Sequence, residues 1–179
     1  MMEKKSKKSL LNFYKNKTIF ITGINGFKGS WLYLILKTLG AKVYGIDKNK
    51  KSLSLFSKYK LSDKNIYKKI NIKNFEKLNN FTNKINPDLI FHMASESLVF
   101  DCYEDPLKAI NTNLDGLSNL LYIYKKKKLK KKISLNIITS DKCYLPKNKK
   151  KYIETDELGG NDIYSATKAC QEILTKSFY

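Results

Sequence analysis

The sequence predicts an α/β protein built on a doubly wound parallel sheet. Short runs of β-branched and aromatic residues alternate with longer segments whose apolar residues have helical spacing. A glycine-rich stretch, TGINGFKG, lies between the first apolar run and the first helical segment. Because strands that alternate with helices pair in parallel through right-handed crossovers, one open sheet with helices on both faces is expected. The 179 residues are enough for one domain with a real core.

Five apolar runs predict the strands. Each is short and bounded by polar or turn-forming residues, as is typical of strands buried in a parallel sheet. The expected strands are residues 17–22, 42–46, 65–70, 88–93 and 133–139.

Four longer segments predict helices, namely residues 27–39, 75–85, 106–125 and 163–178. Gly40 follows the first as a natural C-terminal cap, and the second stops before Pro87. The domain is expected to span residues 15–179, preceded by a loosely ordered, lysine-rich N-terminus at residues 1–14.

The net charge of +19 is the most prominent compositional feature, and every basic residue is lysine. Specific recognition of bases and phosphates often uses the planar fork of arginine, which is missing here. Lysines are spread through every segment, which indicates a compositional bias of the genome more than a binding face. We therefore expect no nucleic-acid partner.

The apolar runs are too short to cross a membrane, which needs roughly 18 to 20 residues. No pattern typical of a signal peptide follows the lysine-rich start. We expect a cytoplasmic protein without a membrane partner. Three widely spaced cysteines, odd in number and without a C-x-x-C pair, predict neither disulfides nor a metal site. His92, the one histidine, is interpreted as packed at a strand end.

Gly23, Gly26 and Gly29 have GxxGxxG spacing between a strand and a helix. Such a turn brings the backbone close to a pyrophosphate at a helix N-terminus. An Asn-Gly hairpin is the alternative, but the helical spacing after Gly26 disfavours it. Asp47 closes the second strand, where a carboxylate accepts hydrogen bonds from a ribose diol and repels a 2′-phosphate. NAD is thus favoured over NADP, although the adjacent Lys48 weakens this preference.

Tyr164 and Lys168 are four residues apart on one face of the last helix. A tyrosine, with an ordinary pKa of about 10, is a poor base at neutral pH, but a nearby ammonium lowers such a pKa. The pair therefore predicts a phenolate that takes a proton from a hydroxyl group. An exposed helical face is the alternative interpretation of the spacing.

Three stretches resemble the extended short-chain dehydrogenases/reductases, and within them the CDP-glucose 4,6-dehydratase group. They are NGFKGSWL (25–32), TSDKCY (139–144) and ETDELGGNDIYSATKACQEI (154–173), and the resemblance covers nearly everything from residue 17 onward. Lys28 and Lys142 select this group, since other members more often have a hydrophobic residue and a glutamate there. The resemblance implies a Rossmann-like fold and NAD as the cofactor.

The resemblance also implies the residues of the site. Cofactor-binding residues would be Gly23, Gly26, Phe27, Lys28, Gly29, Asp47, Asn71, Ile72, Ala94, Tyr164 and Lys168. Catalytic residues would be Tyr164, Lys168, Asp141, Lys142 and Ser140. Asn113 matches a helix asparagine of the family and is given low weight.

The implied reaction is an internal redox elimination of water from CDP-glucose, which gives a 4-keto-6-deoxy sugar nucleotide. Tyr164 would take the C4 hydroxyl proton beside Ser140, and Asp141 would protonate the departing C6 hydroxyl. Lys142 stands where related dehydratases have the base for the C5 proton. It would act there as a neutral amine, or, if charged, stabilise the enolate; a structural lysine paired with Asp141 is a further alternative.

The chain also departs from the family. Ser95, Glu96, Ser97 and Phe100 replace typical residues near the cofactor and substrate, and Ile163 replaces a proline. Family members are longer, so the resemblance implies an N-terminal portion without the substrate-binding part. The last strand would then be an unprotected edge, NAD binding weak and turnover unmeasurable.

Two other functions remain open. A sugar-nucleotide epimerase of the same fold would need Tyr164 and Lys168 but no acid at Asp141, so TSDK disfavours it. A non-catalytic remnant is the second. In a full-length form we expect a homodimer through helices 106–125 and 163–178.

Overall fold

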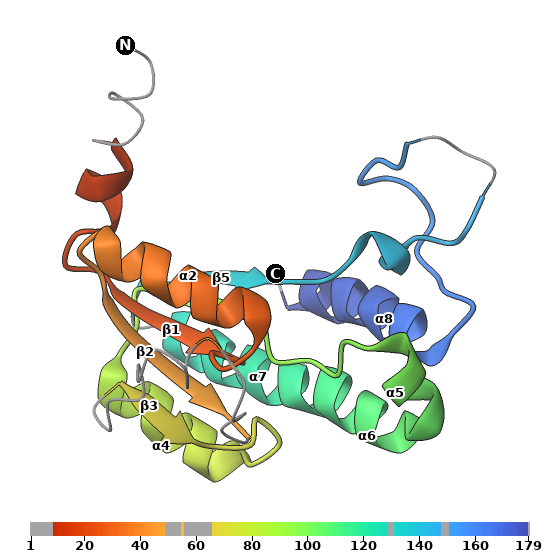
Figure 1. Ribbon diagram of the computed structural model, residues 1–179, viewed down its shortest axis with the longest axis horizontal. Coiled ribbons are helices and arrows are strands. Elements are labelled where there is room, and N and C mark those ends of the chain that lie inside the picture. The colour runs from red at the N-terminus through yellow and green to blue at the C-terminus, as the bar shows by residue number, and fades with distance from the viewer. Residues whose placement is uncertain (1–8, 49–54, 56–65, 129–130, 148–150, 179) are drawn as a thin grey trace.

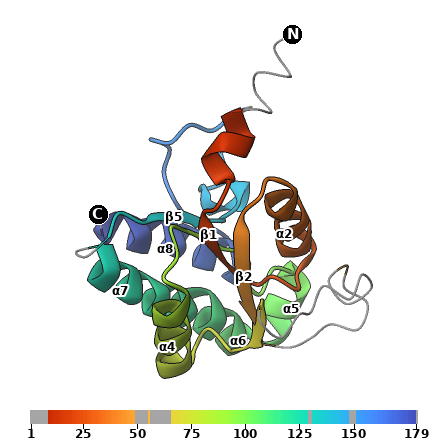
Figure 2. The ribbon, with the colours of Figure 1, turned by 90° about the vertical axis from the view of Figure 1, so that its left-hand side faces the viewer.

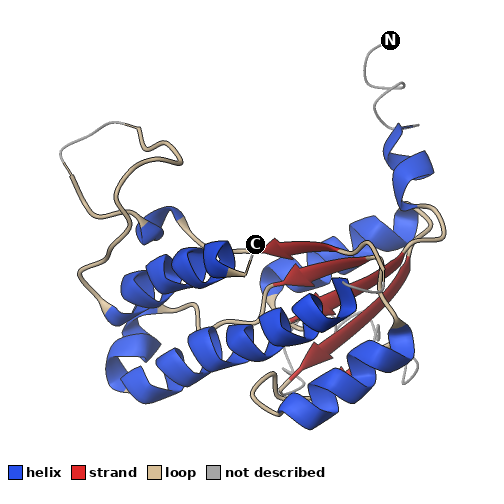
Figure 3. Cartoon of the chain, turned by 180° about the vertical axis from the view of Figure 1, so that it is seen from behind, coloured by secondary structure: helices blue, strands red, loops and turns tan. Residues whose placement is uncertain are grey.

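The fold is a five-stranded parallel sheet with helices on both faces, seen in a computed structural model that describes residues 9–48, 55, 66–128, 131–147 and 151–178 (Figure 1). The strand order is β3-β2-β1-β4-β5, and each neighbouring pair is parallel. Figure 3 shows the strands side by side and pointing the same way. The strands are β1 (Thr18–Thr22), β2 (Lys42–Asp47), β3 (Tyr67–Lys69), β4 (Leu89–His92) and β5 (Ser134–Ile137). The predicted fold class is confirmed, with β5 at one edge of the described sheet.

The helices lie in the connections between the strands and, in the case of the last one, after β5. They are α2 (Phe27–Thr38), α4 (Phe75–Ile85), α5 (Val99–Glu104), α6 (Pro106–Ile110), α7 (Gly116–Lys128) and α8 (Ile163–Ser177), with a π-helical turn at Asn111–Asp115 and a 3₁₀ turn at Asp141–Cys143. None of the helices in the described part of the chain is long and apolar enough to span a bilayer.

Two hydrophobic cores form because side chains alternate along β1. Ile19 and Ile21 face α2 and pack with Leu36, whereas Phe20 faces α4 and α7 and packs with Leu120. Figure 2 shows α2 on one side of the strands and α4 and α7 on the other. The sheet is therefore covered on both faces, as a parallel sheet requires.

The apolar spacing correctly predicted that α2 is a helix, but several of the apolar residues that give this spacing are not in the core. Phe27, Trp31 and Ile35, from the regular apolar pattern, are largely exposed. The buried face consists of Gly29, Ser30, Tyr33 and Leu36. Small residues at the start of α2 allow the helix to approach the glycine turn closely, so backbone packing overrides side-chain hydrophobicity there. Gly40 has a φ of +78° and donates to Lys37 O at 3.0 Å, which confirms its capping role.

The helix predicted at residues 106–125 is interrupted by the π-helical turn between α6 and α7. The turn is closed by Gly116 N, which donates to Asn111 O, five residues back. An extra residue in one turn rotates the helix face and turns Asn113 into the protein, where it is fully buried. The predicted helix is therefore present along residues 106–125, and the π-helical turn at residues 111–115 is a feature that its apolar spacing did not indicate.

The N-terminal segment is helical at residues 9–14, where a loosely ordered chain was expected for residues 1–14. Lys15 N donates to Leu11 O at 3.0 Å, and Tyr14 packs against the core beneath α2. Residues 1–8, together with Asn65 at the start of the predicted third strand, lie outside the described residues.

Candidate functional site

A cavity of about 400 Å³ opens at the carboxyl ends of the strands, the usual place for a ligand in an open α/β sheet. Every residue predicted to bind a cofactor lines it. The lining comprises Gly23, Gly26, Phe27, Lys28, Gly29, Asp47, Asn71, Ile72, Ala94, Tyr164 and Lys168, together with Ile46, Lys48, Ile70, Met93, Ser95, Glu96, Ser97, Leu98, Thr112, Ile138 and Thr139. Segments far apart in the sequence thus meet at one cavity.

The glycine turn is shaped by close backbone approach. Gly23 has a φ of +74°, and a Cβ built there would lie 2.8 Å from Ala94 N. A Cβ on Gly29 would collide with Gly23 O. Both positions therefore require glycine, and the turn between β1 and α2 exposes its backbone to the cavity.

Asp47 lies beside this turn at the end of β2. Its Oδ2 accepts a hydrogen bond from Asn25 N at 3.1 Å, which fixes the carboxylate against the turn. Asn71 and Ile72 line the same end of the cavity. The Asn71 Oδ1 accepts from Lys73 N at 3.1 Å, and Ile72 is buried against Gly116.

Tyr164 and Lys168 lie on α8 and line the same cavity as the glycine turn. The helix begins at Asp162, whose side chain accepts from Ser165 N at 2.9 Å and from Ser165 Oγ at 2.6 Å. The ammonium of Lys168 is 5.8 Å from the centroid of the Tyr164 ring. The predicted phenol–ammonium pair therefore exists on one helical face.

Lys168 is 2% exposed, and its Nζ donates to Ile138 O at 3.2 Å and to Gln171 Oε1 at 3.0 Å. Burial, reinforced by the positive charge of Lys28, lowers the pKa of Lys168 from 10.5 to about 8. The lysine is thus held in place near the end of β5 with its proton weakly bound.

Asn113 makes more hydrogen bonds around the site than its low weight in the sequence-based prediction suggested. Its Oδ1 accepts from Ser95 Oγ and Glu96 N, both at 2.9 Å, and its Nδ2 donates to Thr167 Oγ1 at 3.0 Å. Gln171 Nε2 donates to the Asn113 carbonyl at 2.8 Å. The π-helical turn thereby joins the loop after β4 to the helix of Tyr164.

Gln171 was missed altogether. It links Asn113 to Lys168, and the only available signal was its position three residues after Lys168 on the same helical face.

His92 ends β4 as predicted, packed and fully buried. The Thr22 Oγ1 lies 2.8 Å from His92 Nδ1 and also accepts from Met93 N and Ala94 N, each at 3.2 Å. Because that hydroxyl accepts twice, its own proton goes to Nδ1, and burial lowers the pKa of His92 to about 3. A neutral histidine therefore fixes the chain that leads into Ala94.

The predicted dehydration residues lie in the 3₁₀ turn that follows β5 and at its N-cap. Asp141 and Lys142 are exposed and line a second, smaller cavity of about 210 Å³, which also includes Tyr144, Pro146, Tyr152, Asn161, Asp162 and Ser165. Ser140 caps the turn; its Oγ accepts from Lys142 N at 3.3 Å and donates to Asp141 Oδ1 at 3.1 Å. The structure thus groups these residues with one another, and their catalytic roles stay predictions.

The sheet, the glycine turn and the tyrosine–lysine pair together define a short-chain dehydrogenase/reductase of the extended, Rossmann-like class. The model of the GDP-mannose 4,6 dehydratase family matches residues 20–179, and the chain belongs to that family. The class predicted from the motifs is confirmed.

Among known proteins, the chain is 39% identical over 171 residues to the CDP-glucose 4,6-dehydratase of Salmonella typhimurium, covering 93% of this chain and 46% of that protein. It superposes with a TM-score of 0.81 on the epimerase Mth375 of Methanothermobacter thermautotrophicus, at 22% identity and covering 96% of this chain and 50% of that one. The dTDP-glucose 4,6-dehydratase of Bacillus anthracis, solved with NAD, superposes with a TM-score of 0.72 at 24% identity, and the match covers 91% of this chain and 50% of that one. The chain spans less than half the length of the curated relatives it matches.

Proposed function

We propose that the chain supplies the dinucleotide-binding half of an NAD-dependent nucleotide-sugar 4,6-dehydratase whose substrate is CDP-glucose. The observation that carries this proposal is the single cavity that joins the glycine turn and Asp47 to Tyr164 and Lys168. The similarity to the Salmonella CDP-glucose 4,6-dehydratase supports the choice of sugar nucleotide.

The residues present fit NAD. Two glycines that cannot carry a Cβ form the cradle for the pyrophosphate beside the N-terminus of α2. Lys28 lines the cavity there, where a cation complements phosphate charge, and Asp47 is placed for the adenosine ribose. Asn71 and Ile72 would border the adenine. When bound, NAD supplies a reversible hydride acceptor.

Tyr164 takes the proton of the sugar C4 hydroxyl in this proposal. The ammonium of Lys168 stabilises the phenolate form through its charge, and it is itself oriented by Gln171 and by Ile138 O. The burial of Lys168 excludes water from the back of this pair and strengthens the interaction.

Asp141 and Lys142 serve the elimination of water. Asp141, when protonated, donates its proton to the departing C6 oxygen, and Lys142 acts at C5, either as a base or through its positive charge on the enolate. Their cavity also contains Asp162, the N-cap of the Tyr164 helix.

An epimerase is the second candidate. Inversion at C4 needs Tyr164 and Lys168 alone, and Asp141 and Lys142 line a different cavity from that pair. Several similar solved structures are epimerases.

A chimera tests the proposal, with this chain replacing the matching 46% of the Salmonella CDP-glucose 4,6-dehydratase. With CDP-glucose and NAD, we expect a 4-keto-6-deoxy product and its loss on Tyr164→Phe or Asp141→Asn. A folded chimera that inverts C4 without releasing water would favour the epimerase. In Lys142→Ala, retained exchange of the C5 proton with solvent would remove Lys142 from the role of base.

The cytoplasmic location and the homodimer of the whole protein stay proposals. The dimer proposal concerns the helices at residues 106–125 and 163–178, on which the apolar side chains of Leu107, Tyr122 and Ile173 are exposed.

A further inference from the structure

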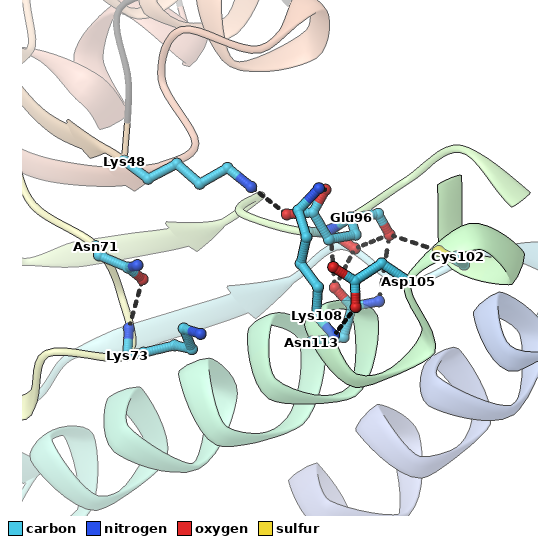
Figure 4. A network of polar contacts seen from close by, with 9 residues as sticks. Lys48, Asn71, Lys73, Glu96, Cys102, Asp105, Lys108 and Asn113 are labelled. Atoms are coloured by element: carbon cyan, nitrogen blue, oxygen red, sulfur yellow. Dashed lines mark hydrogen bonds and ion pairs between the residues drawn. The ribbon is translucent and has the colours of Figure 1, made fainter. Parts of the chain in front are cut away.

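Two residues that line the candidate cofactor cavity form an ion pair. The Nζ of Lys48, directly after β2, contacts Glu96 Oε1 in the loop after β4, and both residues line the cavity (Figure 4). The Glu96 side chain is 13% exposed, whereas that of Lys48 is 38% exposed. The glutamate is therefore the more firmly buried partner of the pair.

The Glu96 backbone is fixed by the π-helical turn. Asn113 accepts from Glu96 N at 2.9 Å and donates to Glu96 O at 3.2 Å. Glu96 O also accepts from Ser95 Oγ at 3.1 Å. Figure 4 shows the Lys48 side chain extending toward Glu96. The backbone that carries the carboxylate is thus held in place independently of Lys48, and the carboxylate itself contacts Lys48 and, at 3.8 Å, Lys108.

The position of Lys48 suggests how the ion pair affects the choice between NAD and NADP. Lys48 follows Asp47, the carboxylate placed for the adenosine ribose, and a cation beside that ribose attracts a 2′-phosphate. Without Glu96, Lys48 would therefore favour NADP and oppose the effect of Asp47. When Lys48 is paired with Glu96, the carboxylate compensates the charge of its ammonium group and holds that group away from the ribose.

We propose that Glu96 is a specificity-determining residue that holds Lys48 away from the cofactor ribose and thereby secures the preference for NAD over NADP. This inference rests on the proposed dinucleotide site. It explains how a chain with a lysine next to its ribose-binding aspartate can still prefer the cofactor without the phosphate.

The test is a fluorescence titration of the 179-residue chain with NADH and with NADPH, at low and at physiological salt. Glu96→Gln keeps the shape of the side chain and removes its charge. We expect the ratio of NADPH to NADH affinity to rise about fivefold, since exposed charge pairs contribute on this scale. The gain should shrink as salt screens the new contact. The double variant Glu96→Gln/Lys48→Ala should return the ratio to the wild-type value.

Two variants serve as controls. Glu104→Gln removes the same charge from an exposed position on α5 and should leave the ratio unchanged. Lys108→Ala removes the second, more distant lysine at 3.8 Å from Glu96 and should also leave it unchanged. Thermal unfolding of each variant checks that the fold is intact.

The outcomes separate the two proposals. If the wild type binds NADH and Glu96→Gln gains no NADPH affinity, the role of Glu96 is refuted while the dinucleotide site stands. The same holds if the gain persists in the double variant, because Lys48 would not be its source. If the wild type binds neither dinucleotide, the proposed function fails and this inference falls with it.

Discussion

The two ends of the candidate site differ in how firmly the surrounding sheet and loops hold their residues. The dinucleotide end rests on β1, which is buried along nearly its whole length and has a partner strand on each side. The sugar end follows β5, which pairs only with β4 among the described strands and is at most half-buried. Asp141 and Lys142 beyond it are exposed, whereas the glycine turn is packed against the backbone of Ala94.

This contrast teaches where the rigidity of the site comes from. A central strand fixes the residues at its end through neighbours on both sides, so Gly23 and Asp47 need no ligand to be in place. An edge strand fixes the following residues less, so we expect the geometry of Asp141 and Lys142 to depend on the sugar and on further parts of a longer protein. Substitutions at the dinucleotide end should therefore reduce the free energy of unfolding and the affinity for NADH much more than substitutions at the sugar end.

The largest effect is expected for Gly23→Ala. The new methyl group would meet the Ala94 backbone in a left-handed conformation, so the free energy of unfolding should fall by at least about 3 kcal/mol, and NADH binding should be lost. Gly40→Ala is the matched control: its φ is also positive, but the nearest atoms are 3.7 Å away. Strain alone should cost it about 1 to 2 kcal/mol. Urea unfolding measures both, and equal losses would contradict a tightly packed turn.

Lys168 should make stability depend on pH. Its pKa is about 8 in the folded chain, against 10.5 without burial, so burying the charge costs stability below pH 8. Stability should accordingly rise between pH 8 and 10.5, by up to about 3 kcal/mol. Lys168→Met removes this titration and should flatten the rise. Urea unfolding of both proteins at pH 7 to 9.5 checks the difference, and parallel curves would mean that Lys168 is not buried as described.

Asn113→Ala should cost about 2 to 3 kcal/mol, because it leaves several buried hydrogen-bonding groups without their partner. Asn111→Ala is the control in the same turn, since the Asn111 side chain makes no hydrogen bond to another described residue. It should change stability by less than about 0.5 kcal/mol. Thermal unfolding distinguishes the two, and a silent Asn113→Ala would show that the turn does not join the β4 loop to α8.

Lys142→Ala should have the smallest effect. The side chain is exposed on the 3₁₀ turn, so both the free energy of unfolding and the affinity for NADH should stay within about 0.5 kcal/mol of the wild type. The two measurements on the purified chain check this. A loss comparable with that of Asn113→Ala would mean that the sugar end is as firmly built as the dinucleotide end.

Much of the dinucleotide end could be predicted from the sequence, because local patterns encode it. Gly23 and Gly29 are required by backbone geometry between one strand and one helix, and Tyr164 and Lys168 share a face through their spacing alone. The outward face of α2 could not be predicted, because Trp31 and Ile35 have the same spacing whether they are buried or exposed.

The remaining errors concern interactions between distant segments. The π-helical turn at Asn113 depends on hydrogen bonds to the β4 loop and to α8, which no local pattern reveals. The pairing of Lys48 with Glu96 likewise joins two strand ends. Whether Asp141 and Lys142 share a cavity with Tyr164 depends on the path of the chain after β5, which the TSDK motif does not specify.

The central claim is that the glycine turn and the tyrosine–lysine pair form one nicotinamide-dinucleotide site. Backbone amide NMR of the chain during titration with NAD tests this most directly. We expect saturable shifts at residues 23–29, at Asp47, at Ala94 and at Tyr164 together, and their absence in Gly23→Ala. Shifts confined to the glycine turn, with Tyr164 and Lys168 unmoved at saturation, would contradict a shared site.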